Sequence, residues 1–286
     1  YLRPDHELEL RDILAEQAPQ YPVSLSHEVL PQIREYERTS ATVINAYVQP
    51  IMRSYLRRLR DGLKAEGYGG ELYLMNSLGG TMAVEMAEAF PIQMIESGPT
   101  AGTLVATLVG SQVKSSNVLS FDMGGTTAKA CVIRDGKPII SQDYEVARVS
   151  RFKKGSGLPV GIPVVDLLEI GAGGGSIAEI DTLGLLRVGP RSAGAEPGPA
   201  CYGAGGAEPT VTDANVALGL INPDFFLGGT MALDRAAAEQ VIEERIGKPL
   251  GLDVEQAAAA IHQVVTESMT EAARVHSVEI NVDIRD

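Results

Sequence analysis

The sequence predicts an α/β protein whose mixed sheet contains antiparallel hairpin strands and is flanked by helices. Three observations carry this prediction. Residues 71–110 alternate strand-like apolar runs with helical patterns in the order βαβα. Residues 117–149 form a meander of apolar runs, two of them joined by Asp135-Gly136, a pair typical of two-residue hairpin turns. The last third of the chain is mainly helical in pattern.

The elements follow in order from their periodicity and their breakers. Apolar residues recur at spacings of three and four over residues 39–66, which predicts one long helix, bent at Pro50 and ended by Gly67. We then expect strands at 71–77 and 92–97, with helices at 81–90 and from the glycine-rich 98–102 to Gly110. Residues 150–163 and 192–209 are predicted to be irregular because they are rich in glycine and proline.

The C-terminal part begins with an apolar strand, a run of glycines at 171–175 and a second strand or helix start. Helices are predicted at 212–220, 234–246 and 253–275. Asp253 with Gln256 three residues later forms a capping-box pattern for the last of them.

Composition excludes several classes of protein. The chain has 286 residues and a net charge of -13 without Lys/Arg-rich blocks, which disfavours a nucleic-acid surface. No apolar run is long enough for a membrane span and no signal peptide is apparent, so we expect a cytoplasmic protein. Cys131 and Cys201 are too few for a disulfide framework, and the four histidines lack metal-ligand spacing.

The segment SFDMGGTTAKACVI (residues 120–133) contains the strongest candidate site. A strand ends at Asp122 and turns through Gly124 and Gly125, which would leave backbone N–H groups open to a phosphate. Thr126 and Thr127 add hydroxyl donors, and Asp122 could hold Mg²⁺ or its waters. An ordinary tight turn is the alternative for this segment taken alone.

Three further glycine clusters follow strand-like runs, and together they favour a phosphate site over an ordinary tight turn. They lie in MNSLGGT (75–81), ESGPTAG (96–102) and GAGGGS (171–176). Ser97 is predicted to cap a helix with Pro99 at its first position, so that Ser97 and Gly98 could approach a ligand. Gly173, Gly174 and Gly175 are candidate cofactor-binding residues, because they too could approach a ligand closely. Each cluster alone is more often a turn, but together they suggest loops that converge at one edge of the sheet.

Two single residues remain open to more than one interpretation. Asp213 in TVTDAN either caps a helix or forms a polar wall of the active cleft. Lys129 follows the corner inside an apolar strand and could reach a phosphate, pair with a carboxylate or simply be exposed.

Six stretches of the chain together resemble the hydantoinase/oxoprolinase family of A-subunit type, and they occur in the order typical of that family. The family includes N-methylhydantoinase, 5-oxoprolinase and subunits of acetone and acetophenone carboxylases. The resemblance runs from about residue 28 to the end. The stretches are REYERTSATVINAYV (34–48), SGPTAG (97–102), SFDMGGTTAKACVI (120–133), EIGAGGGSIA (169–178), VGPRSAGAEPGPACYG (188–203) and EPTVTDANVALGLINPDFFLGG (208–229).

The resemblance implies an actin-like ATPase fold, in which two RNase H-like domains close over ATP and each supplies one phosphate hairpin. FDMGGTT matches the second hairpin, so Asp122, Gly124, Gly125, Thr126 and Thr127 inherit contacts to phosphates and Mg²⁺. The first hairpin and the glycine-rich segment near the adenosine have no counterpart here. We therefore expect residues 1–35 to end a preceding region and residues 36–286 to be an incomplete ATPase domain.

The expected function is ATP-dependent activation of a cyclic amide or ketone carbonyl by phosphorylation, together with a second subunit of the hydantoinase B type. Asp122 and Asp213 are the candidate catalytic acids, with Asp122 mainly a metal anchor. Thr127, Ala128 and Lys129 resemble the carboxylase and N-methylhydantoinase branches more than 5-oxoprolinase. A small-molecule kinase of the same fold and a non-catalytic scaffold are the alternatives, and we expect weak or no ATP hydrolysis from these 286 residues alone.

Overall fold

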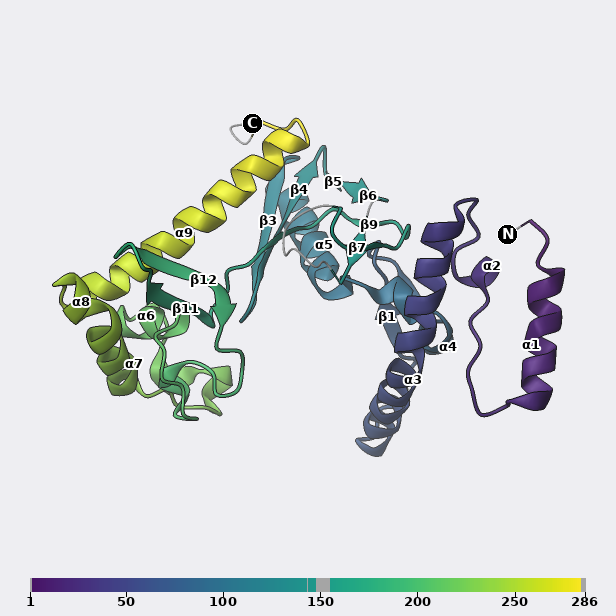
Figure 1. Ribbon diagram of the computed structural model, residues 1–286, viewed down its shortest axis with the longest axis horizontal. Coiled ribbons are helices and arrows are strands. Elements are labelled where there is room, and N and C mark those ends of the chain that lie inside the picture. Colours follow the sequence, from purple (N-terminus) through teal and green to yellow (C-terminus); the bar gives the residue numbers. More distant parts are fainter. Residues whose placement is uncertain (1, 143, 148–154, 284–286) are drawn as a thin grey trace. The chain divides into compact units, whose positions relative to one another are not determined.

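The computed structural model describes residues 2–142, 144–147 and 155–283, and it divides into two compact units (Figure 1). Unit 1 comprises Tyr1–Ser120 and Cys131–Asp166, and unit 2 comprises Phe121–Ala130 and Leu167–Asp286. The chain passes from one unit to the other within strands β3 (Val118–Met123) and β4 (Ala128–Arg134). The class is α/β with short antiparallel sheets, as predicted.

Unit 1 combines helices with short pairs of strands. Strands β1 and β2, β4 and β5, β6 and β9, and β7 and β8 pair antiparallel. Besides β3 and β4, its elements are α1 (Asp5–Gln17), α2 (Ser26–Val29), α3 (Glu35–Ala65), β1 (Tyr73–Met75), β2 (Thr81–Ala83), α4 (Val84–Ala89), η1 (Pro91–Met94), α5 (Ser97–Gln112), β5 (Lys137–Pro138), β6 (Ile140–Ser141), β7 (Glu145–Val146), β8 (Leu158–Pro159) and β9 (Val164–Val165).

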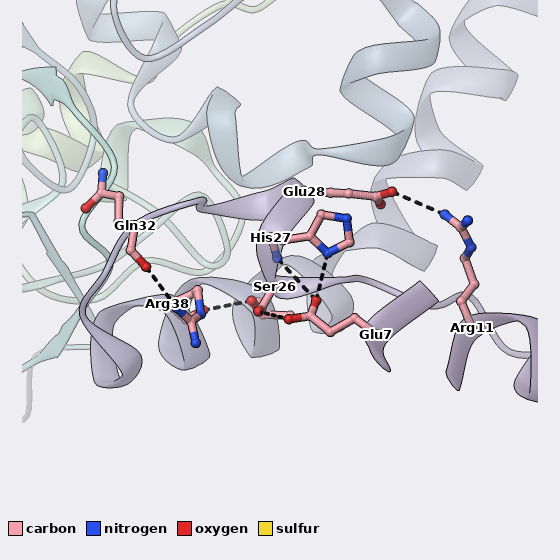
Figure 2. A network of polar contacts seen from close by, with 8 residues as sticks. Glu7, Arg11, Ser26, His27, Glu28, Gln32 and Arg38 are labelled. Carbon is pink, nitrogen blue, oxygen red and sulfur yellow. Dashed lines mark hydrogen bonds and ion pairs between the residues drawn. The ribbon is translucent and has the colours of Figure 1, made fainter. Parts of the chain in front are cut away.

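Helix α1 is attached by polar contacts, since none of its residues is buried. Figure 2 shows the carboxylate of Glu7 accepting hydrogen bonds from Ser26 Oγ at 2.6 Å and from the backbone N–H of His27 at 3.2 Å. Glu7 Oε2 also lies 3.0 Å from His27 Nδ1, and Arg11 Nη1 lies 3.2 Å from the carboxylate of Glu28. These contacts fasten α1 to α2.

Helix α3 confirms the prediction for residues 39–66 and extends it by one turn at the N-terminus. Its buried residues recur at spacings of four and seven and include two polar ones, Asn45 and Gln49. Both amides donate to the carbonyl of Ala89 at 3.0 Å, so they fix α3 against the end of α4. Gly67, at φ +85°, follows the helix in the left-handed conformation that glycine favours.

The predicted βαβα order in this unit is wrong in two places. Residues 81–83 begin the segment predicted to be helical, but they form β2 and pair with β1, so the helix starts only at Val84. Residues 92–97 were predicted to form a strand, whereas Pro91 starts the 3-10 helix η1 and Ile92 is fully buried. Short apolar runs do not separate a strand from a buried turn of helix.

The hairpin turn at Asp135-Gly136 is confirmed. Both residues have positive φ, 52° and 70°, as a two-residue type I′ turn requires. Ile133 pairs with Pro138 and Arg134 with Lys137 across the turn. The predicted loop at 150–163 lies partly outside the described residues, and its later part contains β8.

Unit 2 packs helices α6 and α9 against short strands. Strand β10 pairs antiparallel with β4 and β11 with β12. Its core includes the fully buried Ile242, Ile246 and Ile261 together with Val265. Its elements are β10 (Leu168–Ile170), β11 (Ser176–Ile180), β12 (Leu186–Ser192), η2 (Ala200–Tyr202), α6 (Val211–Ala217), η3 (Pro223–Phe225), η4 (Leu227–Gly229), α7 (Arg235–Ile242), η5 (Glu243–Gly247), α8 (Lys248–Leu250) and α9 (Val254–Glu279).

All three predicted C-terminal helices are present. The Asp253–Gln256 capping box of α9 has both of its hydrogen bonds. The predicted helix at 234–246 continues from α7 through one π-helical turn, η5, and the irregular 192–209 contains one 3-10 turn, η2. Strand β12 had no counterpart in the sequence analysis. No helix within the described residues is both long and apolar enough to cross a membrane.

Candidate functional site

The GGTT corner (residues 124–127) joins β3 to β4 and closes as a tight turn. The N–H of Gly124 donates to the carbonyl of Thr127 at 2.9 Å. Within the described residues, the N–H groups of Gly125 and Thr126, the hydroxyls of Thr126 and Thr127 and the carboxylate of Asp122 form no hydrogen bond. Gly125, Thr126 and Asp122 are exposed. The corner therefore offers open donors next to an open carboxylate.

A second segment, the glycine loop (residues 171–175), donates hydrogen bonds to backbone carbonyls of this corner. The N–H of Gly174 donates to the carbonyl of Gly124 at 3.0 Å, and the N–H of Gly175 donates to the carbonyl of Gly125 at 2.6 Å. The N–H of Gly173 donates to Ser176 Oγ at 2.9 Å. Because these carbonyls point toward the glycine loop, the trans peptides direct the following N–H groups the other way.

This contact explains why three glycines occur in a row. A Cβ on Gly173 would lie 2.7 Å from the carbonyl oxygen of Gly124, and one on Gly175 would lie 3.0 Å from that of Gly125. A Cβ on Gly174 would lie 2.8 Å from Thr212 Oγ1. All three N–H groups are donated inside the unit, and those of Gly174 and Gly175 hold the corner. Direct contact of these glycines with a cofactor stays a prediction.

Asp213 has the capping role that was one of its two interpretations. It is fully buried, and its carboxylate accepts hydrogen bonds from the N–H groups of Ala200, Cys201 and Thr210 at 3.2, 2.8 and 2.9 Å. The hydroxyl of Thr210 donates a fourth at 2.8 Å, and the same hydroxyl accepts from the N–H of Asp213 at 3.2 Å, which completes the capping box of α6. With both oxygens engaged and no exposed surface, the carboxylate has no path to a substrate in this arrangement.

Lys129 lies on β4 directly across from Glu169 on β10. Side chains at directly opposed positions of an antiparallel pair lie on the same face of the sheet and interact. The register therefore favours the interpretation in which Lys129 faces a carboxylate.

The other two glycine clusters meet inside unit 1. The hydroxyl of Thr100, in the first turn of α5, lies 3.4 Å from the carbonyl of Ser77 in the β1–β2 connection. Ser97 is the first residue of α5 and not its cap, because the cap position belongs to Glu96 at φ 59°. Gly98 is exposed, with open space where a Cβ would be. The clusters thus form one pair in each unit, and the convergence of all four stays a prediction.

The two cysteines are poor candidates for chemistry. Both are free and fully buried. Burial raises the pKa of the Cys131 thiol to about 11. Burial and the neighbouring Asp213 raise the pKa of Cys201 above its usual range. A thiol with a raised pKa is a weak nucleophile at neutral pH.

Sequence reasoning missed Thr212 and Ser176 as parts of this site. Thr212 donates from both its N–H and its hydroxyl to the carbonyl of Gly174, and Ser176 accepts from the glycine loop. A signal was present, because both residues lie within motifs already singled out, Ser176 in GAGGGS and Thr212 in TVTDAN. No group of three or more His, Cys, Asp or Glu that could hold a metal occurs in the described part of the chain. A divalent cation here would rely on Asp122, water and ligand oxygens.

Residues 38–286 match the protein family described as Hydantoinase/oxoprolinase. The caprolactamase subunit alpha of Pseudomonas jessenii is 40% identical over 99% of this chain and 39% of its own length. The acetophenone carboxylase gamma subunit of Aromatoleum aromaticum is 36% identical over 96% of this chain and 37% of its own length.

A solved structure supports the same assignment. The nucleotide-free structure of acetone carboxylase, an enzyme of ATP-dependent acetone carboxylation, superposes with a TM-score of 0.81 at 29% identity. The superposition covers 98% of this chain and 39% of the acetone carboxylase chain. The chain thus spans 37% to 39% of the length of these three relatives. From the extent of these matches, the chain belongs to the hydantoinase/oxoprolinase family.

Proposed function

We propose that the GGTT corner binds the phosphates of Mg-ATP, in a protein that uses ATP to activate a cyclic amide or ketone carbonyl. One observation carries this proposal. The exposed carboxylate of Asp122 and the open N–H groups of Gly125 and Thr126 lie at the same corner, and none has an intramolecular partner among the described residues.

The residues present suit a metal-bound triphosphate. Consecutive backbone N–H groups in a turn form a concave anion site, and glycine lets a phosphate approach without interference from a Cβ. The hydroxyls of Thr126 and Thr127 supply two further donors. In a chain of net charge -13, an anion has to be bound by such local dipoles and by a cation. Asp122 is the carboxylate placed to hold Mg²⁺ or its waters.

When bound, ATP would supply the γ-phosphoryl group that turns a carbonyl or enol oxygen into a leaving or activating group. The protein's own part would be to position and to neutralise charge, as is general for phosphoryl transfer. Asp122 would anchor the cation, and the corner would orient the phosphates. We propose that the second sequence candidate, Asp213, acts only by holding α6, because it is buried and fully hydrogen-bonded.

The fold and partner proposals rest on the relatives. We propose the actin-like ATPase arrangement for the complete protein, and we propose Ser97 and Gly98 of unit 1 as nucleotide-binding residues. Caprolactamase subunit alpha and the acetophenone carboxylase gamma subunit are each named as one subunit of a larger enzyme. By analogy, we propose that this protein works with a second, hydantoinase B-type subunit in the cytoplasm.

Calorimetry with Mg-ATP on the full-length protein tests the proposal. We expect Asp122→Ala to weaken binding by about tenfold to a hundredfold, the range typical of groups that support a metal. Asp224→Ala is the matched control, because Asp224 is an exposed carboxylate of the same unit, outside the corner.

The outcomes separate the candidate functions. Binding by the wild type and the control, with loss in Asp122→Ala, would support the nucleotide site. No binding by any of the three would favour a scaffold. Stable phosphorylation of a sugar or acid by the purified protein without a second subunit would favour a small-molecule kinase instead.

A further inference from the structure

The carbonyl of Gly174 is held by two donors from one residue. The N–H of Thr212 donates to it at 2.7 Å and the Thr212 hydroxyl at 2.8 Å. Thr212 is 6% exposed, and a carbonyl oxygen has two lone pairs. Both lone pairs of the Gly174 carbonyl oxygen therefore accept a hydrogen bond from Thr212, in the first turn of α6.

Gly174, which Thr212 holds in this way, is itself hydrogen-bonded to the GGTT corner. The N–H of Gly174 donates to the carbonyl of Gly124 at 3.0 Å, and the next residue, Gly175, donates to the carbonyl of Gly125 at 2.6 Å. These two bonds set the tilt of the peptide planes around Gly125. The open N–H groups of Gly125 and Thr126 belong to those planes.

Thr212 itself lies on a rigid element. The capping box of Thr210 and Asp213 on either side of it is fully buried. Ala214 and Val216 of the same helix are fully buried in the two apolar clusters of unit 2. A group held this firmly can restrain a glycine-rich segment that has no side chains with which to hold itself.

We propose that Thr212 is a positioning residue for the phosphate site, whose hydroxyl fixes the glycine loop and thereby the direction of the open N–H groups of Gly125 and Thr126. It touches neither nucleotide nor metal. The inference rests on the proposed function in one respect only, the identity of the ligand at the corner.

Two variants isolate the hydroxyl. Thr212→Ala removes it and adds no atom, whereas Thr212→Ser keeps it and removes only the methyl group. Thr266→Ala is the matched control, because the Thr266 hydroxyl donates at the same 2.8 Å, but to the carbonyl of His262 within α9. All three are made in the full-length protein.

Two measurements are made on each variant. Amide hydrogen exchange reports how firmly the N–H groups of Gly174 and Gly175 are held, and calorimetry reports the Kd for Mg-ATP. For Thr212→Ala we expect exchange at these two amides and the Kd each to rise by about fivefold, the factor that one lost net hydrogen bond corresponds to. Thr212→Ser and Thr266→Ala should match the wild type in both.

The outcomes are distinct. Unchanged exchange at Gly174 and Gly175 in Thr212→Ala would overturn the proposal, as would a Kd equal to that of the wild type despite faster exchange. A loss that Thr212→Ser does not restore would also overturn it, because the methyl group would then be responsible. If the wild type binds no Mg-ATP, the proposed function fails, and the exchange data alone decide whether Thr212 holds the corner.

Discussion

Replacing Gly173 by alanine should break the contact between the glycine loop and the GGTT corner. The added Cβ would lie 2.7 Å from both the carbonyl oxygen of Gly124 and the carbonyl carbon of Gly125. Ordinary contact between such atoms needs about 3.5 Å. The two segments must therefore separate by about 0.8 Å. Both contacts are with backbone, so no side chain can rotate away to relieve them.

The cost follows from what this separation breaks. The bonds from Gly174 N–H to Gly124 and from Gly175 N–H to Gly125, now 3.0 and 2.6 Å, would lengthen to or beyond the limit of a useful hydrogen bond. At about 1 kcal/mol net for each bond, the loss is about 2 kcal/mol. This lies within the 1 to 3 kcal/mol that overpacking of a well-packed site costs.

Urea-dependent hydrogen exchange of the peptide covering residues 171–176 measures this loss in unit 2 alone. Gly125→Ala is the control, because nothing lies within 4 Å of a Cβ at that position and its φ is not positive. We expect Gly173→Ala to lower the opening free energy by about 2 kcal/mol, and Gly125→Ala to leave it unchanged but to weaken Mg-ATP binding. Equal opening free energies for Gly173→Ala and the wild type would refute the packing argument.

Three further predictions concern other buried or bonded groups. Asp213→Ala should cost about 3 kcal/mol or more, because buried N–H groups lose their acceptor, and thermal unfolding would show this; a stable but inactive variant would instead support a catalytic role. Cys131 and Cys201 should resist iodoacetamide at pH 8 until the protein is unfolded, since both are buried with raised pKa values; rapid labelling of native protein would contradict this. Burial alone would raise the pKa of Glu7, but hydrogen bonds from Ser26 and His27 outweigh it and lower the pKa from 4.5 to about 2. The attachment of α1 should therefore be complete above pH 4.5 and lost as the pH falls toward 2. Amide exchange in α1, corrected for intrinsic rates, should show that loss in the wild type and a smaller pH dependence in Glu7→Gln, which keeps only the Arg11–Glu28 contact.

The successful predictions for the fold concern features that neighbouring residues determine. The helical periodicity of α3, the capping box at Asp253 and the turn at Asp135-Gly136 each depend on residues a few positions apart. The failures concern short segments whose state depends on distant partners. Residues 81–83 are a strand because β1 pairs with them. Ile92 lies in a buried 3-10 turn because side chains from α2, α3 and residues 160–162 pack around it.

The candidate site divides in the same way. The donors and the carboxylate at the corner were readable from Asp122 and the residues after it, because a strand that turns through glycines leaves N–H groups unpaired. The supporting role of Gly173, Gly174 and Gly175 was not readable, because their N–H groups could have faced either a ligand or the corner. The hydrogen bonds of Gly174 and Gly175 to residues about 50 positions earlier, and that of Gly173 to Ser176, decide it.

By itself, the sequence determined the α/β class, the long helices, the glycine turn at the corner and the family, since these depend on local periodicity, turn chemistry and motif order. Only the tertiary structure decided that Asp213 is a buried cap and that Thr212 holds the glycine loop against the corner. The physical reason is that a polar side chain in a motif can serve a ligand or the backbone equally well. Burial and hydrogen-bond geometry, which are properties of the folded chain, determine which of the two it serves.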